Sequence, residues 1–196
     1  MIARRGETKD NAELSPKNGY YDRLTALPNR ELFVERLKRT LAQAHTQKRI
    51  FAVLFIDLDG CEGVRDLIGH AVCDAMLLEA ARHLRNGVRG QDTVARLGGN
   101  RLAVLLPILG DVAEAGTLAE TILNRFDFAN GEHGCLISAA IGISVHPDDG
   151  ADTETLLAKA DAAAWLSRNN GGMTYCYFRQ AFEGKSCSRL FPGPDR

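Results

Sequence analysis

The sequence contains no apolar run long enough to cross a membrane. Its longest apolar runs, residues 50–56 and 102–109, fall far short of the roughly 20 residues that a transmembrane helix needs. The polar N-terminus also lacks the apolar stretch of a signal peptide. We therefore expect a cytoplasmic protein with no membrane insertion in this segment.

Charge of one sign is not in excess either. The 196 residues include 24 basic and 25 acidic side chains, which gives a formal net charge of -1. Domains that bind nucleic acid are commonly basic, because they must neutralise phosphates. We therefore expect no nucleic-acid partner, and any nucleotide site must be a local feature of the surface.

Cysteine is scattered, odd in number and never arranged as C-x-x-C. The positions are Cys61, Cys73, Cys135, Cys176 and Cys187. This pattern argues against a disulfide framework and against a structural zinc site. We expect reduced thiols in the core or on the surface. No internal repeat is present, and the length suits one domain with polar ends.

Short apolar runs alternate with helical patterns along the chain. The patterns predict a first helix opened by Pro28, further helices over residues 71–86, 112–126 and 153–168, and strands over residues 51–56, 93–97, 102–106, 136–145 and 173–178. The run over residues 51–56 is typical of a central strand covered on both faces, and it ends at Asp57. Gly98-Gly-Asn100 predicts a hairpin turn, because Gly and Asn tolerate positive φ. The sequence therefore indicates an α/β fold with a central mixed sheet flanked by helices.

Four ordered blocks resemble the GGDEF family, whose active members condense two GTP molecules into cyclic di-GMP. The blocks are Asp22–Arg30, close to D-x-L-T-G-L-P-N-R; Asp57-Leu-Asp59 with Gly69-His70 and Asp74; Ala95–Val104, where the family has A-R-x-G-G-D-E-F; and Ala160-Asp161 with Ala164-Trp165. The resemblance implies a polymerase-palm-like fold with the signature on a β-hairpin. We expect a flexible leader over residues 1–19, the domain over residues 20–178, and a fraying tail or linker over residues 179–196.

The metal site that the resemblance implies is incomplete. Asp57 and the backbone carbonyl of Leu58 would hold Mg²⁺, a hard ion that prefers oxygen ligands, together with a carboxylate from the hairpin. Asn100 stands in the place of that carboxylate, and Arg101 reverses the charge of the next acidic position. We expect Asp57 to be at most a weak metal ligand, and no cofactor to be required. The structural alternatives are that Asp57 and Asp59 are solvated turn residues and that Arg101 is an exposed hairpin residue.

The positions that would bind nucleotide are changed as well. By resemblance, Glu62 replaces a phosphate-binding Lys and Arg65 replaces a guanine-contacting Asn, whereas Asp74 keeps a second guanine contact. Arg168 replaces the late Lys of the family, and Gly172 replaces the Arg after it. Unit charges about 4 Å apart interact by on the order of 4 kcal/mol at an effective dielectric of 20, so a Glu beside a triphosphate opposes binding. We therefore expect no diguanylate cyclase activity.

One family feature is retained upstream of the hairpin. Arg89-Gly-Gln-Asp92 resembles the R-x-x-D of the family's inhibitory site, which binds cyclic di-GMP. Arg89 has forked donors that suit a phosphate or a guanine edge, and Asp92 can accept from guanine N–H groups. The family site also uses an Arg from the next helix, for which Arg125 is the nearest candidate. The structural alternative is a surface ion pair.

Two classes of function follow from these residues. The domain is either a binding module, for cyclic di-GMP through Arg89 and Asp92 or for GTP through Asp74 and Arg168, or a dimerisation and interaction domain that acts without nucleotide. Residues 177–190 faintly resemble the start of the connection to an EAL phosphodiesterase domain, so we expect an EAL or sensory domain in the full protein. Residual cyclase activity ranks third.

Overall fold

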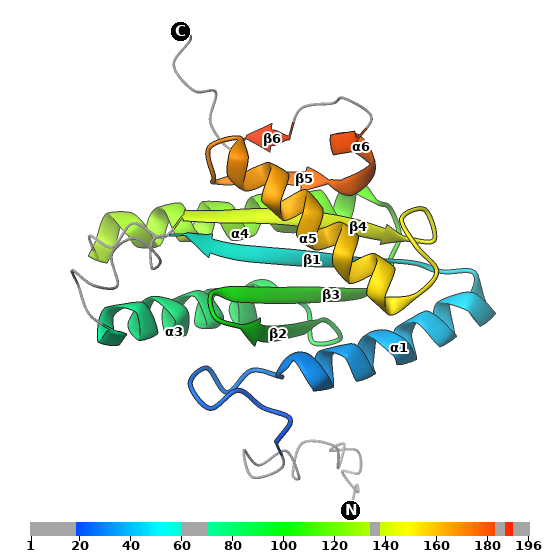
Figure 1. Ribbon diagram of the computed structural model, residues 1–196, viewed down its shortest axis with the longest axis horizontal. Helices are drawn as coiled ribbons and strands as arrows, with labels where there is room; N and C mark the ends of the chain where they lie inside the picture. The colour runs from blue at the N-terminus through cyan, green and yellow to red at the C-terminus, as the bar shows by residue number, and fades with distance from the viewer. Residues whose placement is uncertain (1–18, 60–69, 134–137, 183–186, 190–196) are drawn as a thin grey trace, which may run out of the picture.

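A mixed sheet with strand order β2-β3-β1-β4-β5-β6 forms the centre of the computed structural model, which describes residues 19–59, 70–133, 138–182 and 187–189 (Figure 1). The strands are β1 (Ile50–Asp59), β2 (Thr93–Gly98), β3 (Arg101–Leu109), β4 (Ser138–His146), β5 (Thr174–Tyr177) and β6 (Ser188–Arg189). The helices are α1 (Arg30–Gln47), α3 (His70–Gly87), α4 (Ala113–His133), α5 (Thr153–Asn169) and α6 (Phe178–Phe182). Strands β4 and β5 are parallel and the other neighbours antiparallel. The expected α/β fold with a mixed sheet is confirmed.

Helices cover both faces of the sheet (Figure 1). Alternate side chains of β1 point to opposite faces, so Leu54 and Ile56 pack in one core with α3 and α4, while Val53 and Phe55 pack in another with α1 and α5. This double burial explains why the strand is apolar at consecutive positions, as expected of a covered central strand. Within the described residues, every helix is too short or too polar to cross a bilayer.

Helix α5 packs directly against β4 at Gly142. A β-carbon at this glycine would stand 2.0 Å from the carbonyl oxygen of Ala160 and 2.2 Å from the backbone nitrogen of Ala164. The helix presents small buried side chains at the contact, including Ala163. The close approach keeps α5 low over the sheet, and its last turn carries Arg168.

Two expected boundaries are wrong. Pro28 does not open α1: Asn29 is the N-cap, and its side chain accepts a hydrogen bond from the backbone nitrogen of Leu32 at 3.0 Å. Asn serves better as an N-cap because it has a side-chain acceptor that Pro lacks. Asp57 and Asp59 do not follow β1 but belong to it, since both are paired with residues of β4.

The segment after β5 is not simply a fraying tail. It forms α6 and then β6, which pairs antiparallel with β5. A disulfide joins Cys176 of β5 to Cys187, the residue just before β6. The expectation of reduced thiols is wrong for this pair, because a reversal of the chain brings together two cysteines that their spacing did not relate. Cys73 is buried, whereas Cys61 and Cys135 lie outside the described residues.

Candidate functional site

The signature residues end β2, form the turn at Gly99 and Asn100, and begin β3. Gly98 and Gly99 have φ values of 125° and 55°, which favour glycine. Asn100 is only 5% exposed. Arg101 is exposed, and its guanidinium carbon lies 6.0 Å from the centre of the Phe55 ring. The predicted hairpin is therefore confirmed, and the exposure of Arg101 agrees with the structural alternative for that residue.

Asn100 faces the end of β1. Its Nδ2 donates to the carbonyl oxygen of Leu58 at 3.3 Å, and the Leu58 amide donates to the carbonyl oxygen of Asn100 at 3.2 Å. The other side-chain atom, Oδ1, is buried and has no hydrogen-bond partner in the described part of the chain. An unpaired buried amide oxygen costs about 1–3 kcal/mol, so Asn100 is not an optimal residue for stability here.

Arg168 joins the end of α5 to the end of β1. Its Nη1 donates to Oδ2 of Asp57 at 2.9 Å, and its Nη2 donates to Oδ1 of Asp59. Burial raises the pKa of the Asp57 carboxyl, and the guanidinium of Arg168 opposes that shift. The two carboxylates therefore share a cation that the protein itself supplies.

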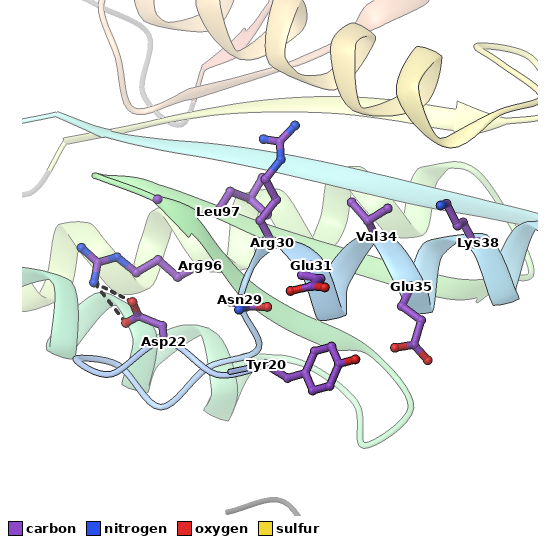
Figure 2. Close-up of a pocket in the computed structure, with 11 residues that line it drawn as sticks. Tyr20, Asp22, Asn29, Arg30, Glu31, Val34, Glu35, Lys38, Arg96 and Leu97 are labelled. Carbon is purple, nitrogen blue, oxygen red and sulfur yellow. Dashed lines mark hydrogen bonds and ion pairs between the residues drawn. The ribbon is translucent and has the colours of Figure 1, made fainter. Parts of the chain in front are cut away.

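The entry motif is connected to the hairpin by an ion pair. Nη1 of Arg96 donates to both carboxylate oxygens of Asp22, at 3.0 and 3.1 Å (Figure 2). Nε and Nη2 of Arg96 donate to the carbonyl oxygen of Gly99 at 3.1 and 3.0 Å. Asp22 also accepts from the amide and hydroxyl of Thr25 at 2.8 and 2.7 Å. Burial opposes ionisation of Asp22, but the hydrogen bonds from Thr25 and Arg96 hold its pKa below the usual value.

This ion pair borders the hollow drawn in Figure 2, whose volume is about 730 Å³. The first turns of α1 form its other wall, with the acidic side chains Glu31 and Glu35 and the basic side chains Arg30 and Lys38. Acidic and basic groups are nearly balanced there, so the hollow has no clear preference for an anion or a cation. Sequence reasoning included Asp22, Arg30 and Arg96 in motif blocks but did not select Glu31, Glu35 or Lys38.

Of the other positions expected to bind nucleotide, only part lies in the described ranges. Glu62 and Arg65 lie outside the described residues. Asp74 is exposed on α3, and Gly172 is in a loop after α5 with a φ of 68°. Across the described ranges, no group of three or more His, Cys, Asp or Glu residues is arranged to hold a metal ion.

Arg89 and Asp92 line a second hollow of about 360 Å³, between the end of β3 and the start of α4. The backbone amide of Arg89 donates to Oδ2 of Asp92 at 2.8 Å. The guanidinium of Arg89 does not contact Asp92 in this way: its Nη2 donates to Oε2 of Glu114 at 2.8 Å. Burial raises the pKa of Asp92 despite the hydrogen bond from Arg89. We call this space the Arg89 hollow; its apolar lining includes Leu106, Leu109 and Leu118.

Arg125 is not one of the residues that line the Arg89 hollow. Its Nη1 donates to the carbonyl oxygen of His83 at 3.4 Å, beside Gly87. Glu114 takes part instead, and sequence reasoning did not select it. The signal that could have found it is Asp111-x-x-Glu114 before an apolar helix, the spacing of a capping box.

The chain is similar to known proteins over most of its length. The family model of the diguanylate cyclase GGDEF domain matches residues 19–174. The chain is 40% identical over 172 residues to the bifunctional diguanylate cyclase/cyclic di-GMP phosphodiesterase MucR of Pseudomonas aeruginosa, a match that covers 87% of this chain and 25% of MucR. It is 36% identical over 162 residues to the diguanylate cyclase TpbB of the same species, covering 81% of this chain and 37% of TpbB. The chain thus spans well under half the length of these relatives.

Solved structures agree on the fold. The isolated GGDEF domain of TpbB matches with a TM-score of 0.77 at 33% identity, over 83% of this chain and 97% of that domain. The GGDEF domain of DgcB from Caulobacter crescentus, determined in complex with cyclic di-GMP, matches with a TM-score of 0.75 at 22% identity, over 84% of this chain and 99% of that one. The latter likeness concerns the fold alone. With the family model matched over most of its length, this chain belongs to the GGDEF family and is a domain of cyclic di-GMP signalling.

Proposed function

We propose that this GGDEF domain does not synthesise cyclic di-GMP and instead acts as a regulatory module that binds cyclic di-GMP through Arg89 and Asp92. The observation that carries the loss of catalysis is the hairpin itself, where Asn100 and Arg101 replace the two acidic residues of the family signature. The observation that carries binding is the placement of Arg89 and Asp92 on one hollow.

The residues at the end of β1 do not fit a tightly held Mg²⁺. Magnesium demands oxygen ligands in near-octahedral geometry and favours carboxylates. The Leu58 carbonyl already accepts from Asn100, and the Asp57 carboxylate already accepts from Arg168. The free acceptor, Oδ1 of Asn100, belongs to a neutral amide and is a poorer ligand than the carboxylate it replaces. Without the metal, little remains to neutralise a triphosphate during phosphoryl transfer.

Binding of cyclic di-GMP draws on two complementary groups. The Arg89 side chain is 63% exposed and can present forked donors to a phosphate. The half-buried carboxylate of Asp92 can accept from the N–H groups of a guanine. MucR and TpbB are both named for cyclic di-GMP metabolism, which makes this dinucleotide the first ligand to test.

The binding proposal is tested by calorimetric titration with cyclic di-GMP. We expect a dissociation constant in the micromolar range or tighter for the unmodified chain, and loss of binding in Arg89→Ala. Arg39→Ala is the matched control, because Arg39 is an exposed arginine of α1 that pairs with its helical neighbour Glu35. Absence of binding to the unmodified chain, or equal binding by Arg89→Ala, would contradict the proposal.

The loss of catalysis is tested separately. The chain is incubated with GTP and either Mg²⁺ or Mn²⁺, and the nucleotides are separated by chromatography beside a GGDEF domain with an unaltered signature. We expect cyclic di-GMP from the reference domain and none from this chain. Appreciable product from this chain would overturn the assignment whatever the outcome of the titration.

A second candidate is a nucleotide-independent dimerisation or interaction domain that controls an attached EAL domain. The observation that favours it is the coverage of the relatives, since the chain matches only a quarter of MucR, whose name joins a cyclase with a phosphodiesterase. Sensing of GTP through Asp74 and Arg168 is less favoured, because Arg168 is already paired with Asp57 and Asp59. If calorimetric titration detects no binding of cyclic di-GMP and none of GTP, the nucleotide-independent interaction domain is favoured.

A further inference from the structure

Building on the proposed cyclic di-GMP site, we propose that Glu114 competes with the ligand phosphate for Arg89 and thereby lowers the affinity of the site. Glu114 is the first-turn acid of α4, and its Oε2 accepts from Nη2 of Arg89 at 2.8 Å. The ligand-binding guanidinium is therefore already occupied by an anion of the protein itself.

Hydrogen bonds fix the Glu114 carboxylate in place. Its Oε1 accepts from the backbone amides of Gly110 and Asp111 at 2.8 and 3.1 Å. Oδ1 of Asp111 in turn accepts from the amide of Ala113 at 2.7 Å. This reciprocal arrangement at the start of a helix resembles a capping box. Because one oxygen is held by the backbone, the other cannot move freely away from Arg89.

The charges around the Arg89 hollow strengthen the competition. Three carboxylates, those of Asp92, Asp111 and Glu114, line the same space as the guanidinium of Arg89. A phosphate that replaces Glu114 at Arg89 would still lie beside the carboxylate it displaced. The negative charges of the phosphate and of the neighbouring carboxylate repel each other, even when solvent screens them. Removing the charge of Glu114 frees Arg89 and also removes the contribution of Glu114 to the repulsion, while Asp92 and Asp111 keep their charges.

The test is calorimetric titration of Glu114→Gln with cyclic di-GMP. Glutamine is accepted in a capping box and can keep the contacts to Gly110 and Asp111, so the helix start is preserved. Exposed ion pairs change binding by modest amounts, so we expect affinity about fivefold to tenfold tighter than that of the unmodified chain. The gain must disappear when Arg89→Ala is added.

Asp111→Asn is the matched control, because Asp111 lines the same hollow but its carboxylate accepts from the amide of Ala113, whereas the described partner of the Arg89 guanidinium is Glu114. It removes the same charge, and Asn also serves well at a helix N-terminus. We expect it to tighten binding by less than half as much as Glu114→Gln. An equal gain would assign the effect to general electrostatics, and an unchanged affinity in Glu114→Gln would overturn the role of Glu114.

The failure of this inference is distinguishable from failure of the proposed function. If the unmodified chain binds through Arg89 and Glu114→Gln binds no better, only the competition is refuted. If neither protein binds, both proposals fail. Thermal melting of each variant beside the unmodified chain ensures that altered binding reflects the site and not the fold.

Discussion

Arg168 and Asp57 are 111 residues apart in the sequence, yet the Arg168 Nη1 atom lies 2.9 Å from Oδ2 of Asp57. Asp59 shares the same guanidinium. The contact joins the last turn of α5 to the end of the central strand, at the position where the family resemblance would place a metal ligand. A fixed side-chain cation thus accompanies carboxylates that would otherwise attract a mobile one.

Replacing that cation should destabilise the protein and make it responsive to Mg²⁺. In Arg168→Gln the carboxylates of Asp57 and Asp59 lose their neutralising partner. The groups are partly exposed, so the free energy of unfolding should fall by only about 1 kcal/mol. Excess MgCl2 should raise the melting temperature of Arg168→Gln more than that of the unmodified chain. Equal responses to MgCl2 in both proteins would contradict this account.

The matched control for Arg168→Gln is Arg179→Gln. Arg179 pairs with Asp148 at 2.8 Å, but both side chains are more than half exposed. Loss of such a pair should change the unfolding free energy by less than about 0.5 kcal/mol, with no effect of MgCl2 beyond that on the unmodified chain.

Restoring one signature acid should be costly unless a divalent cation is present. Asn100→Asp places a carboxylate in a buried position beside the Leu58 carbonyl, where Nδ2 can no longer donate. We expect the unfolding free energy in EDTA to fall by about 1–3 kcal/mol, because a buried group loses its hydrogen bond and gains a charge. Denaturant titrations with and without MgCl2 check this, and MgCl2 should recover part of the loss. A variant as stable as the unmodified chain in EDTA would show that Asp is tolerated there without metal.

The Asp22–Arg96 pair should stabilise the protein in a pH-dependent way. Burial opposes ionisation, but the hydrogen bonds from Thr25 and Arg96 hold the pKa of Asp22 below its usual value. The stabilisation is therefore present above the unfolded pKa of about 4 and is lost as the pH falls through the lowered pKa. Asp22→Asn should therefore lower the unfolding free energy by about 1–2 kcal/mol at pH 7. Urea titrations between pH 7 and 3 should show that difference shrinking below about pH 4. Asp161→Asn, at an exposed position of α5, is the control. It should change the unfolding free energy by less than about 0.5 kcal/mol both at pH 7 and at pH 3.

Gly142→Ala should be the most damaging of these substitutions. The added β-carbon would collide with the backbone of Ala160 and Ala164, so α5 must shift as a whole. Overpacking against a rigid backbone costs about 3 kcal/mol. Gly90→Ala is the control, since its β-carbon would meet no described atom within 4 Å. Chemical denaturation of both variants checks the prediction, and a Gly142→Ala protein of normal stability would mean that α5 can move at little cost.

The features that sequence predicted well depend on local chemistry. Gly98 and Gly99 mark the hairpin because their backbone conformation is local, and residues 51–56 mark the buried strand because both of its faces are covered. The contacts of Arg168 with Asp57 and of Arg96 with Asp22 span 111 and 74 residues. Pattern and spacing carry no information about such contacts, so they emerged only from the fold.

Contacts between residues closer together in the sequence were missed for a different reason. Cys176 and Cys187 are only 11 residues apart, but their pairing depends on the reversal of the chain between β5 and β6. Arg89 and Asp92 were selected from a motif, yet the residue that takes the guanidinium, Glu114, is 25 residues away. A motif identifies a side chain that can bind a ligand, but the fold determines which other side chains of the protein contact it.

Tyr177 is the last residue of β5, and its phenol hydroxyl forms hydrogen bonds at the start of α4. Its hydroxyl accepts from the amide of Gly116 at 2.7 Å and donates to the carbonyl oxygen of Val112 at 2.8 Å. Burial raises the pKa of this hydroxyl to about 12, so it keeps its proton at any physiological pH. Glu114 lies between the two contacted residues in the chain. A displacement of the end of β5 would therefore also act on the two residues that flank Glu114, whose carboxylate accepts from Arg89.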